Sequence, residues 1–189
     1  MKLITAFSCA CFVFAAYHAA GATIYTFDDV SPVEYTMIQD GYGGLQWDNF
    51  FIENGLNAPG FLKGTVSSPN VAFDGLGKPA SIRSADPFTL ESAYFTSVYV
   101  PAQQIRAQGF TRGFQTYDHT FTVNNTAPTL IDFNYVGIDQ VTFTILTSPG
   151  GIFAMDNLVV VIPEPGVCAL FTVAAALGAL GRLRKLETH

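Results

Sequence analysis

The sequence predicts an all-β fold, a single antiparallel β-sandwich of jelly-roll type over residues 23–162. Three observations support this prediction. The stretch is rich in Phe, Tyr, Thr, Val and Gly and poor in Lys, Glu and Leu, a composition that favours strands. Short apolar or alternating runs recur in it between turn signals, and no helical period of convincing length appears. Its length, about 140 residues, suits one domain with a substantial core.

Short strands separated by turn-forming residues account for this whole stretch. We expect strands over residues 23–27, 33–38, 45–52, 70–73, 88–90, 93–100, 107–115, 119–123, 129–135, 140–146 and 152–161. Glycine, proline, aspartate and asparagine mark turns over residues 41–44, 57–60, 74–75, 124–125 and 148–151. The segment from Tyr117 to Thr120 also has the pattern of a turn between two strands. About ten short strands without helices are typical of a sandwich or a barrel.

The first 22 residues have the pattern of a cleavable signal peptide. Lys2 supplies a positive charge, and an almost wholly apolar run follows over residues 3–16. Ala20-Gly21-Ala22 is a small-x-small cleavage site, so we expect cutting before Thr23. The alternative, a permanent transmembrane helix, needs a longer uninterrupted apolar run. The sequence therefore predicts an exported protein.

The last 27 residues have three parts in a fixed order. Pro163-Glu164-Pro165 comes first, residues 166–181 carry no charge, and the cations Arg182, Arg184 and Lys185 follow. An apolar run that ends in cations is typical of a stop-transfer helix with its basic end in the cytoplasm. Sixteen residues is short for a membrane span, which favours a temporary anchor. The alternative, a core helix of the domain, fits poorly with a cationic cluster at the chain terminus.

This tail resembles the PEP-CTERM sorting signal of bacteria that make exopolysaccharide. The resemblance covers about residues 162–186 and includes the tripeptide, the apolar helix and the basic end. It implies that an exosortase-type membrane protease or transpeptidase recognises Glu164 and its flanking prolines. It also implies that the helix holds the chain in the inner membrane until the cut and that the cations set its orientation. The freed protein would then move to the cell surface or the extracellular matrix.

The middle of the chain is acidic and lacks cysteine. Residues 23–162 hold ten Asp and three Glu against two Lys and three Arg. Nucleic acid is a poor partner for such a surface, because phosphate binding needs clustered cations. The acidic loops suit solubility or a divalent cation. Cys9, Cys11 and Cys168 lie in the terminal segments, so no disulfide is expected in the domain.

Three local patterns mark the middle domain: Phe27-Asp28-Asp29, the run 41–50, and the run from Phe153 through Asp156-Asn157 to Leu158. With the run 88–96 they resemble secreted proteins of the PEP-CTERM group and, more loosely, jelly-roll carbohydrate-binding modules. Many such modules hold a calcium ion where the first and last strands meet. The resemblance implies that its ligands are Asp28, Asp29, Asp156 and Asn157, with backbone carbonyls completing the shell. In the alternative interpretation these side chains cap turns or accept backbone hydrogen bonds.

Aromatic side chains are candidates for a surface on which sugar rings stack. Tyr42, Trp47, Tyr94 and Tyr117 are the predicted members of such a surface, together with Tyr99. A tyrosine ring can stack and still form a hydrogen bond through its hydroxyl group. Trp47 is the single tryptophan, and its apolar surroundings in the sequence favour the alternative that it fills the core.

No motif of an established enzyme class occurs in the chain. Glu34, Glu53 and Glu91 stand in no recognisable pattern, and His119 is the single histidine of the mature domain. The sequence therefore predicts a non-enzymatic surface or matrix protein, sorted by an exosortase and associated with exopolysaccharide or biofilm. Two alternatives stay open, a secreted polysaccharide-active enzyme and a protein-binding adhesion module.

Overall fold

A computed structural model describes residues 21–31, 35–148 and 150–163. Within these residues the chain forms ten strands, one short α-helix and two 3-10 turns. The strands are β1 (Ala22–Tyr25), β2 (Thr36–Met37), β3 (Gln46–Asp48), β4 (Phe50–Asn54), β5 (Asn70–Asp74), β6 (Ala80–Ser97), β7 (Gln103–Thr111), β8 (Phe114–Val123), β9 (Thr129–Ile145) and β10 (Phe153–Val161). The helix α1 spans Pro59–Leu62, and the turns η1 and η2 span Tyr42–Gly44 and Gly75–Gly77. The prediction of an all-β domain is confirmed.

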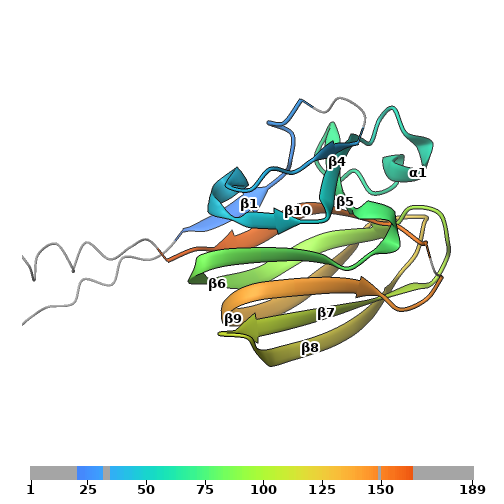
Figure 1. Ribbon diagram of the computed structural model, residues 1–189. Helices are drawn as coiled ribbons and strands as arrows, with labels where there is room; N and C mark the ends of the chain where they lie inside the picture. Colours follow the sequence, from blue (N-terminus) through green and yellow to red (C-terminus); the bar gives the residue numbers. More distant parts are fainter. Residues whose placement is uncertain (1–20, 32–34, 149, 164–189) are drawn as a thin grey trace, which may run out of the picture. The chain divides into compact units, whose positions relative to one another are not determined.

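The described strands form one antiparallel sheet. Its hydrogen-bonded order is β2-β4-β5-β10-β6-β9-β7-β8, with β1 added beside β10 and β3 beside β6. The strands β6, β9, β7 and β8 can be followed in this order in Figure 1. The long strands β6 and β9 lie in the middle of this order and pair with each other. Register shifts along both strands bend the sheet, because a bulged residue adds local twist and curvature. The two sheets expected of a sandwich are therefore joined into one, and the jelly-roll assignment stays a prediction.

Four of the expected strands merge into two. The expected strands 88–90 and 93–100 fall largely in β6, and those at 129–135 and 140–146 fall in β9. In β9 the chain passes Gly137 with a φ of 70° and continues to pair with β6 beyond it. Because glycine adopts this left-handed conformation without strain, the ladder accommodates a bulge there and the strand does not end.

The hairpin of β7 and β8 also differs from the sequence prediction. The expected turn at Tyr117–Thr120 is wrong, because these residues lie in the middle of β8. The turn comes at Arg112 and Gly113, which have left-handed φ angles of 52° and 80° and form a tight two-residue connection. A single left-handed residue, Asn49 with a φ of 58°, likewise divides the expected strand 45–52 into β3 and β4.

Phenylalanine rings from distant parts of the sheet order form the main core. The ring of Phe50 in β4 lies 6.2 Å from that of Phe143 in β9, centroid to centroid, although β5, β10 and β6 separate the two strands in the sheet. Phe153 of β10 contacts both rings, at 6.2 and 6.1 Å. The single sheet therefore curls over itself and encloses a core, as a sandwich does. Each such aromatic pair adds about 0.5–1.5 kcal/mol beyond the area that it buries.

A smaller apolar cluster lies on the outer face of the sheet, under α1. In β5, Ala72 joins the main core while Val71 and Phe73 join this second cluster, because successive side chains point to opposite faces. Phe61 of α1 completes the cluster with Val98, and its ring lies 5.0 Å from that of Phe73. The loop that contains α1 is thereby fixed on the sheet, where it forms one wall of a cleft.

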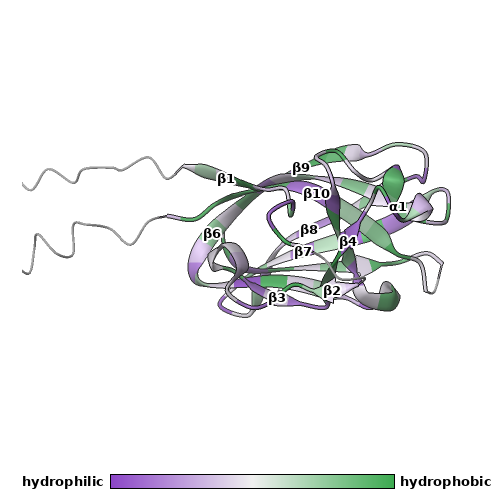
Figure 2. Cartoon of the chain, turned by 90° about the horizontal axis from the view of Figure 1, so that it is seen from above, coloured by the Kyte–Doolittle hydropathy of each residue, from purple (hydrophilic) through white to green (hydrophobic). Residues whose placement is uncertain are grey.

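The two ends of the domain lie side by side. β1 and β10 pair antiparallel, with Ala22 opposite Val161. Both views place the start of β1 at the end of the domain away from α1 (Figure 1 and Figure 2). The expected cleavage site reaches into β1, whereas Glu164, Pro165 and the rest of the predicted sorting tail lie outside the described residues. Among the residues that the structure describes, no helix is long and apolar enough to cross a membrane.

Candidate functional site

A cleft opens beside α1, between two exposed tyrosines. Tyr35 is 52% exposed and Tyr99 is 58% exposed, and both border a cavity of about 630 Å³. The end of β4 and the loop with α1 supply the rest of its lining, which consists of Glu53, Asn54, Asn57, Ala58, Pro59, Gly60 and Phe61. We call this cavity the tyrosine cleft. Its volume lies within the usual range of ligand sites, roughly 300–1,000 Å³.

The polar groups of the tyrosine cleft are one carboxylate and two carboxamides. Glu53 is 7% exposed, and its Oε1 accepts a hydrogen bond from the backbone N–H of Asn54 at 3.0 Å. Its Oε2 is buried and has no hydrogen-bond partner among the described residues. The backbone N–H of Asn57 donates to the carbonyl of Asn54 at 3.0 Å, which folds the following loop into a turn. An unpaired buried acceptor is costly to the stability of the fold.

Close packing of α1 fixes the position of Tyr99. A Cβ atom on Gly60 would lie 2.8 Å from Cγ1 of Val98 and 3.0 Å from Cε1 of Tyr99, so glycine is needed for the helix to approach this closely. The backbone carbonyl of Tyr99 accepts a hydrogen bond from the side-chain amide of Asn125 at 3.3 Å. These contacts hold the ring of Tyr99 at the mouth of the cleft while more than half of it stays exposed.

A second cavity, of about 370 Å³, adjoins the tyrosine cleft and shares Tyr35 and Tyr99 with it. We call it the apolar annex, because its remaining lining consists of Phe51, Phe73, Gly75, Leu76 and Ile152. The rings of Phe51 and Phe73 lie 5.7 Å apart on the outer face of β4 and β5. The molecule thus sets a polar and an apolar concave surface side by side, with the two tyrosines at their common border.

Of the aromatic residues predicted as a sugar platform, Trp47 lies in the core and Tyr42 packs against it. Trp47 is 6% exposed, and its Nε1–H donates to the carbonyl of Tyr42 at 3.0 Å. The ring of Tyr42 stacks on Phe27, and its hydroxyl donates to Asp29 at 2.8 Å. Burial, together with this bond to Asp29, raises the pKa of Tyr42. Trp47 therefore fills the core, as the alternative interpretation has it, and offers no open face to a sugar.

The other predicted aromatic residues are half-buried or lie at the cleft. Tyr94 lies within β6, opposite Asp156 of β10 and Leu130 of β9. The ring of Tyr117 stacks on that of Tyr135 at 4.5 Å with an angle of 12°, so one of its faces is already covered. Among the predicted aromatic residues, Tyr99 is the one that borders the tyrosine cleft.

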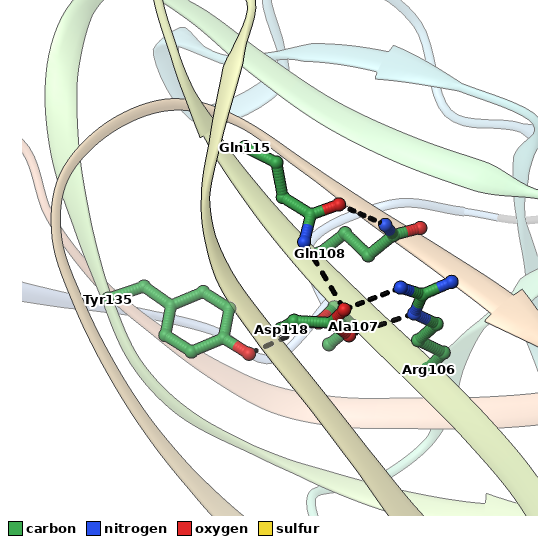
Figure 3. A network of polar contacts seen from close by, with 6 residues as sticks. All are labelled: Arg106, Ala107, Gln108, Gln115, Asp118 and Tyr135. Carbon is green, nitrogen blue, oxygen red and sulfur yellow. Dashed lines mark hydrogen bonds and ion pairs between the residues drawn. The ribbon is translucent and has the colours of Figure 1, made fainter.

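The hairpin of β7 and β8 carries a polar network, shown in Figure 3. The guanidinium of Arg106 donates to both carboxylate oxygens of Asp118, and the side-chain amide of Gln115 also donates to Asp118. The bond from Arg106 lowers the pKa of Asp118. Tyr135 donates its hydroxyl proton to the carbonyl of Ala107 at 3.1 Å, and burial raises its pKa to about 12. Because these groups satisfy one another across the strands, the network braces the hairpin.

The residues implied as calcium ligands take part in hydrogen bonds within the protein. Asp156 accepts bonds from the backbone N–H groups of Val66 and Ser67, at 2.7 and 2.8 Å, and from the hydroxyl of Ser67 at 2.9 Å. Burial raises the pKa of Asp156 to about 6, and these donors offset part of that effect. Asp28 accepts the backbone N–H of Asn70 at 2.9 Å. Both carboxylates thus act as the alternative interpretation describes.

Calcium binding stays a prediction. Among the described residues no group of three Asp, Glu, His or Cys side chains is placed to hold a metal ion, so carbonyl and amide oxygens would have to complete a shell. Oδ1 of Asn157 is buried and has no hydrogen-bond partner in the described part of the chain. Melting the protein with calcium and with EDTA tests the site. A lower midpoint in EDTA supports the ion, and identical midpoints remove it.

Sequence reasoning alone does not find Tyr35, Glu53 or Asn57 as site residues. A usable signal exists in the run from Asn54 to Gly60, which combines two carboxamides, two glycines and a proline directly after a strongly apolar strand. Such a loop on a rigid strand is a common place for binding residues. Nothing in the sequence pairs that loop with Tyr35 or Tyr99, which lie about 20 and 40 residues away.

No protein-family model matches this chain, and no curated protein matches it. The K2 cleaved adhesin domain of Lys-gingipain aligns over 76% of this chain and 99% of its own, with a TM-score of 0.51 and 11% identity. The CBM22-1 xylan-binding domain from Paenibacillus barcinonensis Xyn10C aligns over 78% and 99%, with a TM-score of 0.45 and 12% identity. TmCBM61, solved with β-1,4-galactotriose, aligns over 70% and 100%, with a TM-score of 0.41 and 8% identity. The chain therefore shares the β-domain fold of the adhesin structure, and at 11% identity this similarity concerns the fold alone.

Proposed function

We propose that this chain is a non-enzymatic extracellular module that binds polysaccharide in the tyrosine cleft. One observation carries the proposal: two exposed tyrosine rings flank a cavity that also presents a carboxylate and two carboxamides. Sugars have apolar ring faces that stack on aromatic side chains, and their hydroxyls pair with carboxylates and amides. The carboxamides of Asn54 and Asn57 can bond such hydroxyls, whereas Oε2 of Glu53 is covered by the protein.

The make-up of the cleft supports binding over hydrolysis. Glycoside hydrolysis by the common mechanism needs two carboxylates on opposite sides of the scissile bond. Among the described residues that line the tyrosine cleft, Glu53 is the sole carboxylate. It is also buried, so it is poorly placed to exchange protons with a ligand. The polysaccharide-active enzyme is therefore the weaker alternative.

The two ends of the chain complete the proposal. The signal peptide exports the protein, an exosortase-type enzyme processes it at Pro163-Glu164-Pro165, and the domain stays at the surface or in the matrix with exopolysaccharide or biofilm. Mass measurement of the mature protein, joined to cell fractionation, tests this sequence of events. We expect the loss of residues 1–22 and of most residues after Pro165. An intact C-terminus in the extracellular fraction refutes the processing step.

An array of bacterial and plant polysaccharides, probed with the full chain, tests the cleft. We expect Tyr35→Ala and Tyr99→Ala each to weaken binding about three- to tenfold, because each removes one stacking ring. Phe114→Ala is the matched control, since Phe114 is 76% exposed and lies in β8, outside the cleft. If the tyrosine variants bind as the unaltered chain does, the cleft is not the site. Shortened polysaccharide chains would favour the enzyme, and captured surface proteins without glycan would favour the adhesion module.

A further inference from the structure

Leu76 is the most unusual residue of the apolar annex. It is 77% exposed, and its φ of 56° lies in the left-handed region that bulky side chains rarely adopt. Asparagine or glycine would occupy this position without strain and without exposing hydrocarbon to water. A strained, exposed leucine that borders a cavity therefore indicates that its side chain has a role there.

Asn49 and Gly75 hold Leu76 in this position. The side-chain amide of Asn49 donates to the backbone carbonyls of Gly75, Lys78 and Pro79, at 3.2, 3.1 and 3.2 Å. A Cβ atom on Gly75 would lie 2.6 Å from Cε2 of Phe51, so the turn η2 packs directly against β4. Leu76 thus lies on a turn that is fixed by hydrogen bonds, so this wall of the annex is preformed.

The annex and the tyrosine cleft present opposite chemistry to one continuous ligand. A ligand that passes between Tyr35 and Tyr99 meets a carboxylate and carboxamides on one side. On the other side, beyond the two tyrosines, it meets only apolar side chains and a glycine. A sugar with bare hydroxyls would leave these hydroxyls without partners in the annex, which costs affinity. The preferred ligand therefore carries an apolar group next to a polar ring.

A protein segment fits the annex less well than a substituent does. Seven residues line it, whereas a stable protein interface uses roughly 20–30 residues on each partner. A short acyl ester suits both its apolar lining and its border. The ester carbonyl can accept a hydrogen bond from a tyrosine hydroxyl, and the hydrocarbon can pack on Leu76 and Phe51.

We propose that the apolar annex receives the O-acyl groups of an acylated polysaccharide whose sugar rings lie in the tyrosine cleft. This inference rests on the proposed function and names the ligand class of the same site. It assigns the two cavities separate tasks. The tyrosine cleft binds the glycan backbone, and the annex distinguishes acylated from unmodified glycan.

Alkali provides the test, because it removes O-acyl groups from a polysaccharide without cutting its glycosidic bonds. The probes are the native, O-acetylated polysaccharides of the array and their alkali-treated duplicates. We expect the full chain to bind a native form about 10- to 20-fold more tightly than its duplicate, the low end of the range for one small apolar group in a pocket. Leu76→Asn should abolish this preference, so that the variant binds the native and the alkali-treated forms with equal affinity. Asparagine tolerates the left-handed backbone, and a melting curve checks that the variant is folded.

The outcomes separate the two proposals. Tyr99→Ala should weaken binding of both native and alkali-treated forms, because it borders both cavities. Equal binding of the two forms by the unaltered chain overturns the acyl inference and leaves polysaccharide binding in place. A preference that persists in Leu76→Asn overturns it as well. Binding to neither form of any probe overturns the proposed function, and the inference with it.

Discussion

Asp74 is a buried carboxylate that joins the end of β5 to the start of β10. Its Oδ1 accepts the backbone N–H of Phe153 at 2.7 Å, whereas its Oδ2 is buried without a partner among the described residues. Burial raises the pKa of Asp74 from its usual 3.8 to about 7. The folded protein therefore keeps this carboxyl group neutral up to near pH 7, while in the unfolded chain it ionises near pH 4.

This difference makes the protein less stable as the pH rises from about 4 to about 7. In that window the folded state binds one proton more than the unfolded state, so the free energy of unfolding falls by ~1.4 kcal/mol per pH unit. The whole shift corresponds to a loss of ~4 kcal/mol at most. Asp74→Asn removes the titrating group and keeps an oxygen that can accept from Phe153. As the pH rises from 4 to 8, the free energy of unfolding of the variant should therefore increase by ~2–4 kcal/mol relative to that of the unaltered protein.

Urea denaturation across this pH range measures the effect. Asp156 also titrates in the window, with a pKa raised to about 6, but it is present in both proteins and cancels from the comparison. Asp132→Asn is the control, because Asp132 is an exposed carboxylate of β9 and its curve should run parallel to that of the unaltered protein. If the curve of Asp74→Asn also runs parallel, then Asp74 is already ionised in the folded protein and the reasoning is wrong.

Three further predictions concern the core, Asp156 and the position of Tyr99. Phe143→Ala should lower the free energy of unfolding, measured by urea denaturation, by about 3–5 kcal/mol, because the ring of Phe143 is fully buried among other rings. A loss below ~1 kcal/mol would contradict this packing. Asp156→Asn should cost ~1–3 kcal/mol in the same assay, since either orientation of the amide sets its NH₂ group against a backbone N–H. The exposed variant Asp86→Asn should cost nothing measurable. Gly60→Ala should displace Tyr99 and weaken polysaccharide binding on the array, and unchanged binding would mean that this ring does not contact the ligand.

The alternation of inward and outward side chains along a strand could be predicted from the sequence, but the points where the strands end could not. In β7, Ile105 and Ala107 face the core and alternate with outward polar residues, a pattern visible in the sequence itself. β6, by contrast, continues through Asp86 and Pro87, and β9 continues past Gly137. Turn-forming residues end a strand only when nothing pairs with the chain beyond them. Here neighbouring strands supply partners on the far side of each irregularity, so the ladder resumes.

The tyrosine cleft could not be predicted because three distant segments build it. Tyr35 comes before β4, Glu53 lies in β4 and Tyr99 follows β6. Their proximity depends on the pairing of β4 with β5 and on the apolar cluster that packs α1 against the sheet. Both are tertiary contacts, which local sequence patterns do not show. Trp47 shows the opposite case, since its apolar neighbours in the sequence already favoured burial and the structure buries it. Local context therefore predicts which aromatic rings are covered better than which exposed rings converge.

β10 connects the end of the domain from which the chain leaves to the end that carries the site. Its nine residues span about 30 Å at the usual rise of a strand. Val161 pairs with Ala22 at one end, and at the other end Ile152 borders the annex and accepts the backbone N–H of Val98 at 2.9 Å. The C-terminal end of β10, after which the predicted sorting tail begins, is therefore separated from the cleft by the length of the strand. If the proposed processing occurs, it removes no residue that lines the cleft or the annex, so the affinity for polysaccharide should be the same before and after it.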